Sequence, residues 1–192
     1  MPVYNDNKRF LFRPEDRKLI TDGLYSSATK LKFNLIAGTS TAGIAWAVLL
    51  ADRFADIPFV YVRDKPKNIE LRCPIKGIDS EDDLRGYKVL LVEDLVHPKS
   101  SSAREVQTIR DSKGDCINCL SIFNYGFYEE KNLFKNLNPP CDILSVLTYD
   151  TLIKLAKENK YITQEQEKAL AEWKSDPFNW GTKHGFPKVD KK

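Results

Sequence analysis

The run VLLVEDLVHPKSSS, from Val89 to Ser102, is the stretch of this chain that decides its fold class. Its first four residues are apolar, which is typical of a strand buried on both faces of a parallel sheet. Two adjacent carboxylates, Glu93 and Asp94, follow the strand and precede a loop and a helix. Ligands of open α/β sheets bind at the carboxyl ends of the strands. The run therefore predicts an α/β fold with a binding site at this edge of the sheet.

The helix after this loop is expected at residues 102–112, with Ser102 and Glu105 forming a capping box at its start. The free backbone N–H groups of a helix start, with serine hydroxyls beside them, form an anion site. Carboxylates beside such a site suit a ligand with hydroxyls and phosphate, such as a ribose phosphate, or a magnesium ion that bridges them. A second interpretation is that Glu93 and Asp94 are ordinary loop acids and that the serines only cap the helix.

A second candidate phosphate loop is LIAGTSTAGI, from Leu35 to Ile44, which reads as a strand, a glycine-flanked loop and a helix. Its small residues let backbone N–H groups approach a phosphate or pyrophosphate closely, and we expect Thr39, Ser40 and Thr41 to bind it. The run lacks the lysine of a P-loop and the glycine spacing of a dinucleotide-binding turn. A tight structural turn would have a similar sequence.

Cations follow the next predicted strand at the same edge of the sheet. The run YVRDKPK, from Tyr61 to Lys67, places Arg63, Lys65 and Lys67 there. Such cations can neutralise a pyrophosphate leaving group. Taken by themselves, they also fit an ordinary solvated cluster of surface charges.

Apolar runs alternate with helical patterns along the rest of the chain, as in βαβ units. We expect strands at residues 33–37, 58–63, 89–92, 116–123 and 142–147. We expect further helices at residues 14–31, 44–54, 148–159 and 163–173, and an irregular charged stretch at 64–87. The pattern predicts a single α/β domain over residues 1–192 with a mostly parallel sheet and a polar tail at 182–192.

The composition excludes several classes of protein. The 192 residues are 42% hydrophobic and 30% charged, which argues against disorder. The net charge of +3 is too small for a nucleic-acid-binding face, and no apolar run is long enough for a membrane span. The polar N-terminal segment does not resemble a signal peptide, and the four cysteines indicate reduced thiols. We therefore expect a cytoplasmic protein with neither nucleic acid nor membrane as a partner.

Cys116 and Cys119 have the spacing of a CxxC motif. We expect them in a strand, where residues three apart face opposite sides of the sheet. No second such pair exists, and His97 and His184 are the two histidines of the chain. A zinc site and a hydrolase triad are therefore not expected.

In this order and at this spacing, the three runs resemble the type I phosphoribosyltransferases, and among them the orotate phosphoribosyltransferases. The similarity covers almost the whole chain. IAGTSTAGI resembles the pyrophosphate loop of that family, PFVYVRDKPK the strand before its mobile catalytic loop, and LVEDLV its phosphoribosyl-pyrophosphate signature. The opening PVYNDNK resembles the segment that turns toward the orotate pocket, and SIFNY and AEWKSDP match the C-terminal half.

The resemblance implies a parallel five-stranded sheet flanked by helices, a reduced hood and a homodimer. It implies transfer of phosphoribosyl from phosphoribosyl pyrophosphate (PRPP) to orotate with Mg²⁺, which gives orotidine monophosphate in pyrimidine biosynthesis. In that family the acidic pair, here Glu93 and Asp94, holds the ribose hydroxyls, and Arg63 and Lys67 match cationic positions around the pyrophosphate. We count Lys67 with the acidic pair as catalytic and assign no metal ligand. The loop that wraps the 5′-phosphate corresponds to residues 97–101 and adds His97, Lys99, Ser100 and Ser101 as substrate-binding residues.

Three parts of the predicted site depart from the family pattern. Pro98 deletes an N–H donor in the 5′-phosphate loop, and the glycines that permit a phosphate-cradling turn are absent there. Ile69 and Glu70 replace the His-Gly of the mobile loop. The chain also starts late relative to the family, so we expect a shortened N-terminal hood segment.

These departures leave three hypotheses open. The first is a working orotate phosphoribosyltransferase of reduced activity. The second is a catalytically inactive protein with the phosphoribosyltransferase fold that binds or regulates. The third is a transferase for another base, because the late start removes part of the pocket that selects orotate.

Overall fold

The computed structural model describes residues 3–63, 74–79, 81–97 and 101–187. The chain divides into two compact units. One, the sheet unit, spans Asn7–Thr148, and the other, the helical unit, combines Met1–Asp6 with Tyr149–Lys192. All described residues of the predicted site belong to the sheet unit.

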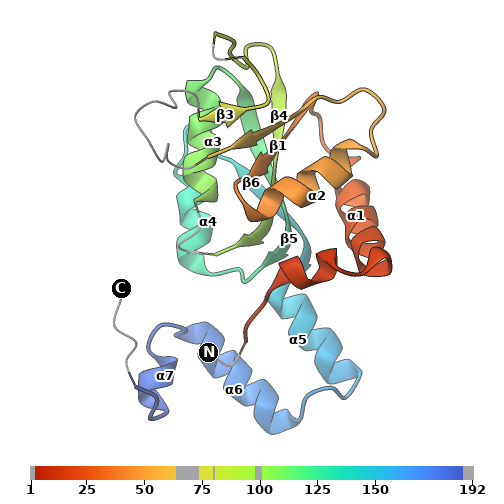
Figure 1. Cartoon of the computed structure of the whole chain (residues 1–192). Helices are drawn as coiled ribbons and strands as arrows, with labels where there is room; N and C mark the ends of the chain where they lie inside the picture. Colours follow the sequence, from red (N-terminus) through yellow and green to blue (C-terminus); the bar gives the residue numbers. More distant parts are fainter. Residues whose placement is uncertain (1–2, 64–73, 80, 98–100, 188–192) are drawn as a thin grey trace. The chain divides into compact units, whose positions relative to one another are not determined.

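The sheet unit is built on strands in the order β3-β2-β1-β4-β5-β6 (Figure 1). They are β1 (Leu35–Thr39), β2 (Phe59–Val62), β3 (Ile75–Lys76), β4 (Lys88–Val96), β5 (Asp115–Asn124) and β6 (Asp142–Thr148). The five strands from β2 to β6 in the sheet order run parallel, and β3 is antiparallel to β2. The predicted parallel five-stranded sheet is confirmed, and β3 adds an antiparallel edge strand.

β3 lies in the stretch 64–87, which we expected to be irregular, so that expectation is wrong for these two residues. Ile75 pairs with Val62 of β2, and the Arg63 backbone N–H donates to the Pro74 carbonyl at 3.0 Å. A strand of two residues is too short to show alternation in the sequence. β3 is therefore defined by its pairing with β2, and the local sequence pattern could not predict it.

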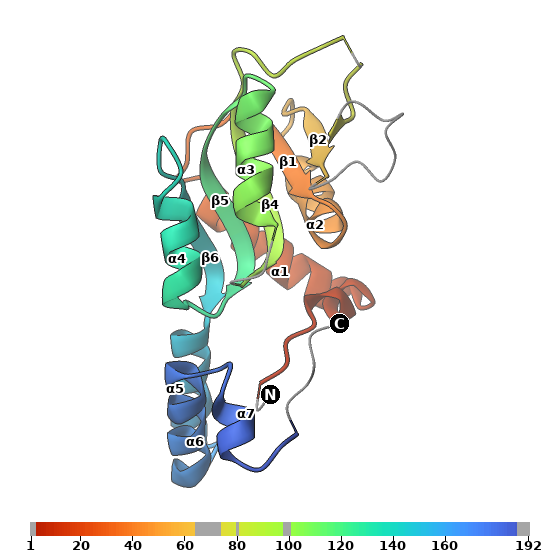
Figure 2. The ribbon, with the colours of Figure 1, turned by 90° about the vertical axis from the view of Figure 1, so that its left-hand side faces the viewer.

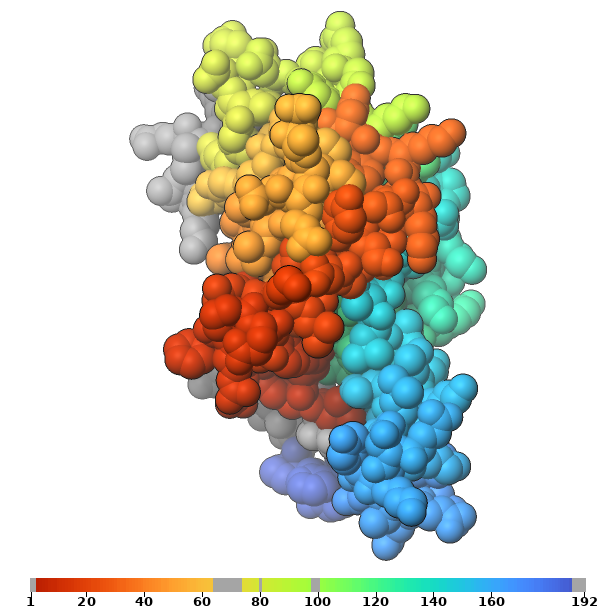
Figure 3. Space-filling view, turned by 90° about the vertical axis from the view of Figure 1, so that its right-hand side faces the viewer, coloured from red at the N-terminus to blue at the C-terminus, as the bar shows by residue number. Residues whose placement is uncertain are grey.

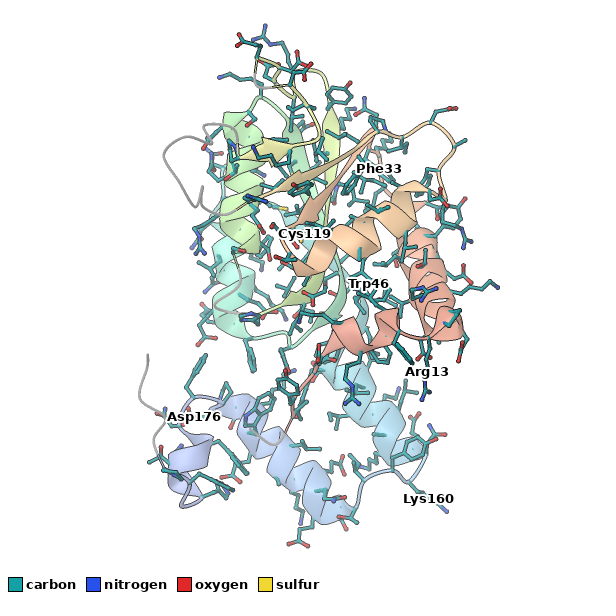
Figure 4. The ribbon with its side chains drawn as sticks, in the orientation of Figure 1. Arg13, Phe33, Trp46, Cys119, Lys160 and Asp176 are labelled. Atoms are coloured by element: carbon teal, nitrogen blue, oxygen red, sulfur yellow. The ribbon has the colours of Figure 1, made fainter. Side chains whose placement is uncertain are left out.

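Helices cover both faces of the sheet (Figures 1 and 2). They are α1 (Pro14–Ala28) and α2 (Ala42–Ala51) on one face, and α3 (Ser102–Asp111) and α4 (Tyr128–Lys135) on the other. Trp46 of α2 packs with Ile36 and Leu90 in one buried cluster (Figure 4), whereas Val106 of α3 packs with Leu91 in the other. Because alternate strand residues face opposite sides, each central strand contributes to both cores.

Figure 3 shows the outer surface of α1 and α2 in red to orange. The 3₁₀ helix η1 (Asn7–Leu11) precedes α1 in the chain. Pro14 stands in the first turn of α1, as predicted, where its missing N–H costs nothing. Neither η1 nor α4 was expected. Both are short, so few turns of helical periodicity are available to indicate them.

The start of α3 at Ser102 is confirmed, but the predicted capping box with Glu105 is wrong. Ser101 occupies the N-cap position and makes no side-chain capping hydrogen bond. The Ser102 hydroxyl instead donates to Glu93 Oε2 at 2.6 Å, and Glu105 is fully buried. A distant carboxylate is the stronger acceptor and takes the hydroxyl that the local pattern assigned to the cap.

The helical unit contains α5 (Tyr149–Glu158), α6 (Gln164–Ser175) and α7 (Trp180–Lys183). A capping box of Thr163 and Gln166 starts α6, and Lys157 bridges to Glu167 at 2.8 Å. The two helices expected at residues 148–159 and 163–173 are confirmed within two residues at each end. In the part of the chain that the structure describes, no helix combines the length and the apolar character needed to cross a membrane.

Candidate active site

The described residues of the predicted site lie at one edge of the sheet unit. β1, β2 and β4 are neighbours and run parallel, so their carboxyl ends lie side by side. Thr39 ends β1, and Arg63 follows β2 directly. Glu93 and Asp94 lie inside β4, which continues to Val96, and do not follow it as expected. The parallel pairing therefore places the acids between two strand-to-helix loops.

Glu93 is held by three hydrogen bonds from its own chain. Its Oε1 accepts from the Thr39 hydroxyl at 2.8 Å and from the Asp94 backbone N–H at 2.9 Å. Its Oε2 accepts from the Ser102 hydroxyl at 2.6 Å. Glu93 is only 6% exposed and Ser102 is fully buried. Both carboxylate oxygens therefore have internal donors.

Burial raises the pKa of Glu93 from 4.5 to about 7. The adjoining carboxyl of Asp94 acts in the same direction, while the hydroxyls of Ser102 and Thr39 lower the pKa. Removing a carboxylate from water disfavours its charged form, and a neighbouring acid adds repulsion. The Glu93 carboxyl therefore holds its proton to a higher pH than an exposed glutamate does.

Asp94 meets the N-terminal segment of the sheet unit. The buried Asn7 side chain donates through Nδ2 to the Asp94 backbone carbonyl at 2.7 Å. The Lys8 Nζ lies 3.9 Å from Asp94 Oδ2, and the Lys8 side chain is 64% exposed. Asn7 thus fixes the backbone of the acid, and among the described residues Lys8 is the nearest cation to its carboxylate.

The loop between β1 and α2 can receive an anion. The Ser40 N–H donates to the Val62 carbonyl at 2.9 Å, which ties the loop to β2. A Cβ at Gly43 would collide with the Thr39 hydroxyl and the Val92 carbonyl, so α2 starts directly against β1 and β4. No described residue accepts a hydrogen bond from the N–H groups of residues 41–43. Free N–H groups at a helix start attract an anion.

The remaining predicted residues are only partly described. Arg63 is half-buried, and its guanidinium lies 5.8 Å from the centre of the Tyr61 ring. His97 and Ser101, on either side of the loop between β4 and α3, are also half-buried. Lys65, Lys67, Lys99 and Ser100 lie outside the described residues. The Thr39 hydroxyl donates to Glu93, the Ser40 N–H donates to Val62, and Thr41 is exposed.

A magnesium ion that arrives with a substrate fits the described residues. Within the ranges that the structure covers, no three His, Cys, Asp or Glu side chains are grouped so that they could hold a metal ion. Mg²⁺ usually keeps several waters and binds one or two carboxylates together with substrate phosphates. Two adjacent acids beside an anion loop suit that mode of binding.

The expected arrangement of the CxxC pair is wrong. Cys116 and Cys119 lie in the same buried cluster, together with Cys141. The pairing of β4 with β5 shifts register between Lys88 and Leu90, which changes the alternation of the strand there. Burial raises the pKa of the Cys119 thiol, so it stays neutral and packs as a small apolar group.

Sequence reasoning missed three residues that shape the site. Asn7 and Lys8 reach Asp94 across 87 and 86 residues of chain, and Ser102 reaches Glu93 across the loop before α3. The spacing of residues close in the sequence does not predict such contacts. The resemblance of the segment PVYNDNK to the part of the family that turns toward the orotate pocket was the one available signal.

The chain is similar in sequence to curated orotate phosphoribosyltransferases. It is 36% identical to that of Cytophaga hutchinsonii over 181 residues, which are 93% of this chain and 83% of the relative. It is also 36% identical to that of Coxiella burnetii over 182 residues, with the same coverage of both chains. No protein-family model matches the chain.

Solved structures share the fold at lower sequence identity. Orotate phosphoribosyltransferase from Aeropyrum pernix superposes with a TM-score of 0.67 at 21% identity, covering 84% of this chain and 85% of that one. A Leishmania donovani UMP synthase gives a TM-score of 0.74 at 20% identity over 91% of this chain and 36% of that longer chain. The Mycobacterium tuberculosis enzyme in complex with PRPP gives 0.62 at 17% identity over 78% of this chain and 83% of that one.

The sequence relatives and the site geometry agree. The region matched at 36% identity covers 93% of the chain, and the acidic pair lies at the carboxyl edge of its parallel sheet. The chain belongs to the orotate phosphoribosyltransferase family.

Proposed function

We propose that this chain transfers phosphoribosyl from PRPP to orotate, which gives orotidine monophosphate and pyrophosphate in pyrimidine nucleotide biosynthesis. Membership of the family supports the reaction. The observation that carries the proposal is the buried acidic pair, Glu93 and Asp94, set between two loops that lead into helix starts. A ribose with phosphates on two sides needs that combination of acceptors and anion sites.

The residues have separate roles in this proposal. Asp94 accepts hydrogen bonds from the ribose hydroxyls. The loop of Thr39, Ser40 and Thr41 takes the pyrophosphate through backbone N–H groups, and Arg63, Lys65 and Lys67 neutralise its charge. His97, Lys99, Ser100 and Ser101 surround the 5′-phosphate.

The chemistry makes mainly electrostatic demands. The bond from the ribose anomeric carbon to the pyrophosphate oxygen breaks, and a bond to the orotate nitrogen forms as that nitrogen loses its proton to water. Positive charge grows on the ribose while negative charge leaves with the pyrophosphate, so fixed acceptors and cations lower the barrier. We count Lys67, which lies outside the described residues, with the acidic pair as catalytic.

Magnesium is proposed as the cofactor that PRPP brings. When bound, it neutralises part of the charge on the pyrophosphate. Asp94 would hold the ribose hydroxyls of the substrate that carries the ion, and no direct protein ligand is assigned. The M. tuberculosis enzyme of the same fold is known in complex with PRPP.

We also propose a domain organisation, an oligomeric state and a localisation. Residues 1–192 form a single phosphoribosyltransferase-like domain with a reduced hood, and two copies form a cytoplasmic homodimer. Conservation of the fold over most of the chain supports this organisation.

Calorimetry with PRPP and Mg²⁺, followed by orotate in the same cell with absorbance monitored, tests the function. Binding together with consumption of orotate is the expected result. Binding without consumption would contradict orotate as the acceptor and point to another base or to a regulatory protein. The absence of binding would contradict the proposed function altogether.

A further inference from the structure

The carboxylate of Glu93 joins the anchor points of two loops. Thr39, which donates to Oε1, is the last residue of β1 and opens the loop into α2. Ser102, which donates to Oε2, is the first residue of α3 and closes the loop that leaves β4. Each oxygen of one side chain therefore serves a different loop.

We propose that Glu93 is a positioning residue, which ties the pyrophosphate loop to the 5′-phosphate loop and leaves Asp94 as the acid that meets the ribose. This inference rests on the proposed function, because that function assigns the two loops to the two phosphate groups. The tie makes the geometry of one loop depend on the contacts of the other.

Burial favours this role for Glu93. Thr39 is 2% exposed and Ser102 is fully buried, so both donors point into the protein. Oε1 already accepts two hydrogen bonds, and the whole Glu93 residue is only 6% exposed, so little of its carboxylate is open to a ribose hydroxyl. Displacing either hydroxyl would leave a buried donor without its acceptor, which is costly. The tie therefore persists when the substrate binds.

The packing around Thr39 transmits the constraint. Gly43, in the first turn of α2, is so close to the Thr39 hydroxyl and the Val92 carbonyl that no Cβ fits there. A shift of Thr39 would move the start of α2 and with it the N–H groups that receive the anion. The Ser102 hydroxyl thus acts on the pyrophosphate loop through two hydrogen bonds to Glu93.

Asp94 has the surroundings of a ligand-binding group. Its nearest described cation is Lys8, 3.9 Å away, which is beyond hydrogen-bond distance. Its backbone is fixed from both sides, because Asn7 binds its carbonyl and Glu93 accepts its N–H. The acid is therefore oriented while its carboxylate can still take a hydroxyl.

A substitution on one loop and a ligand on the other provide the test. Calorimetry with magnesium pyrophosphate is run on the wild type, on Ser102→Ala and on the matched control Ser121→Ala. Ser121 is also fully buried, but its hydroxyl pairs with Ser145 in β6 at 2.7 Å. We expect Ser102→Ala to weaken pyrophosphate binding about fivefold, the size of one lost hydrogen bond, and Ser121→Ala to leave it unchanged. Unchanged affinity in Ser102→Ala would overturn the inference.

Conservative replacement of Glu93 separates positioning from direct binding. In Glu93→Gln, the amide oxygen still accepts from Thr39 and from the Asp94 N–H, and the amide nitrogen can donate to Ser102. We expect pyrophosphate affinity within about twofold of the wild type in Glu93→Gln and a loss of about tenfold in Glu93→Ala, which removes the tie. Equal losses in both variants would overturn the inference.

Unfolding in urea tests the tie without any ligand. Thr39→Val and Ser102→Ala are measured singly and together. Because both hydroxyls share Glu93, we expect the combined change in the unfolding equilibrium constant to differ about fivefold from the product of the single changes. The pair Thr39→Val and Ser121→Ala is the additive control. Additive behaviour of the first pair would contradict the tie, whereas a wild type that binds no pyrophosphate or PRPP would contradict the proposed function.

Discussion

Two neighbouring acids of β4 occupy different surroundings. Glu93 receives three hydrogen bonds from its own chain, two of them from buried hydroxyls. Asp94 is held through its backbone, and its carboxylate faces an exposed Lys8 at 3.9 Å. Adjacent residues of one type can therefore differ in role, because the donors around each side chain decide whether it has an oxygen to offer a ligand.

The largest expected effect is a pH-dependent change in stability at Glu93. Because the folded protein raises the pKa of this group from 4.5 to about 7, the wild type loses stability as the pH rises through that window. The amide of Glu93→Gln does not ionise, so the variant escapes this loss. Its stability relative to the wild type should rise by up to about 3 kcal/mol between pH 4.5 and 8. Urea unfolding at several pH values measures it.

Glu129→Gln is the control for that series, because Glu129 is an exposed glutamate in the same unit. Its stability relative to the wild type should change little over the same range. A difference between Glu93→Gln and the wild type that stays constant with pH would contradict the buried state of Glu93.

An intermediate effect is expected where α2 meets the partner of Glu93. Gly43→Ala would push the Cβ against the Thr39 hydroxyl and the Val92 carbonyl and disturb the Thr39–Glu93 hydrogen bond. We expect a loss of about 2 kcal/mol in unfolding free energy, as for an overpacked core. Gly181→Ala, whose nearest neighbour would be 3.8 Å away, should stay within about 0.5 kcal/mol. A variant at Gly43 that is as stable as the wild type would show that the packing at Thr39 is loose.

The smallest expected effect is at Lys8. Its exposed, distant pair with Asp94 should contribute under about 1 kcal/mol, so Lys8→Ala should change stability little and PRPP affinity less than about threefold. Lys18→Ala removes a comparable exposed pair with Asp22 at 3.9 Å and serves as the control. Calorimetry that showed a tenfold loss for Lys8→Ala alone would make Lys8 a substrate ligand.

The sequence predicts the sheet and the edge that carries the site, because buried strands and strand-to-helix turns are local patterns. These patterns predicted that Glu93, Asp94 and the loop from Thr39 lie at one edge of the sheet, where the structure has them. The capping box at Ser102 and the opposite facing of Cys116 and Cys119 were wrong for physical reasons. A carboxylate nine residues away took the Ser102 hydroxyl, and a register shift changed the alternation of β5. The contacts of Asn7 and Lys8 depend on the fold and leave no local pattern.

The most direct test compares Asp94→Asn and Glu93→Gln in calorimetric titrations with PRPP and Mg²⁺. The divided roles of the two acids predict that Asp94→Asn weakens PRPP binding at least about tenfold, or about 1.4 kcal/mol. Glu93→Gln should remain within about threefold of the wild type, since the amide keeps the hydrogen bonds of the carboxyl. Equal losses in the two variants, or a larger loss for Glu93→Gln, would contradict the account.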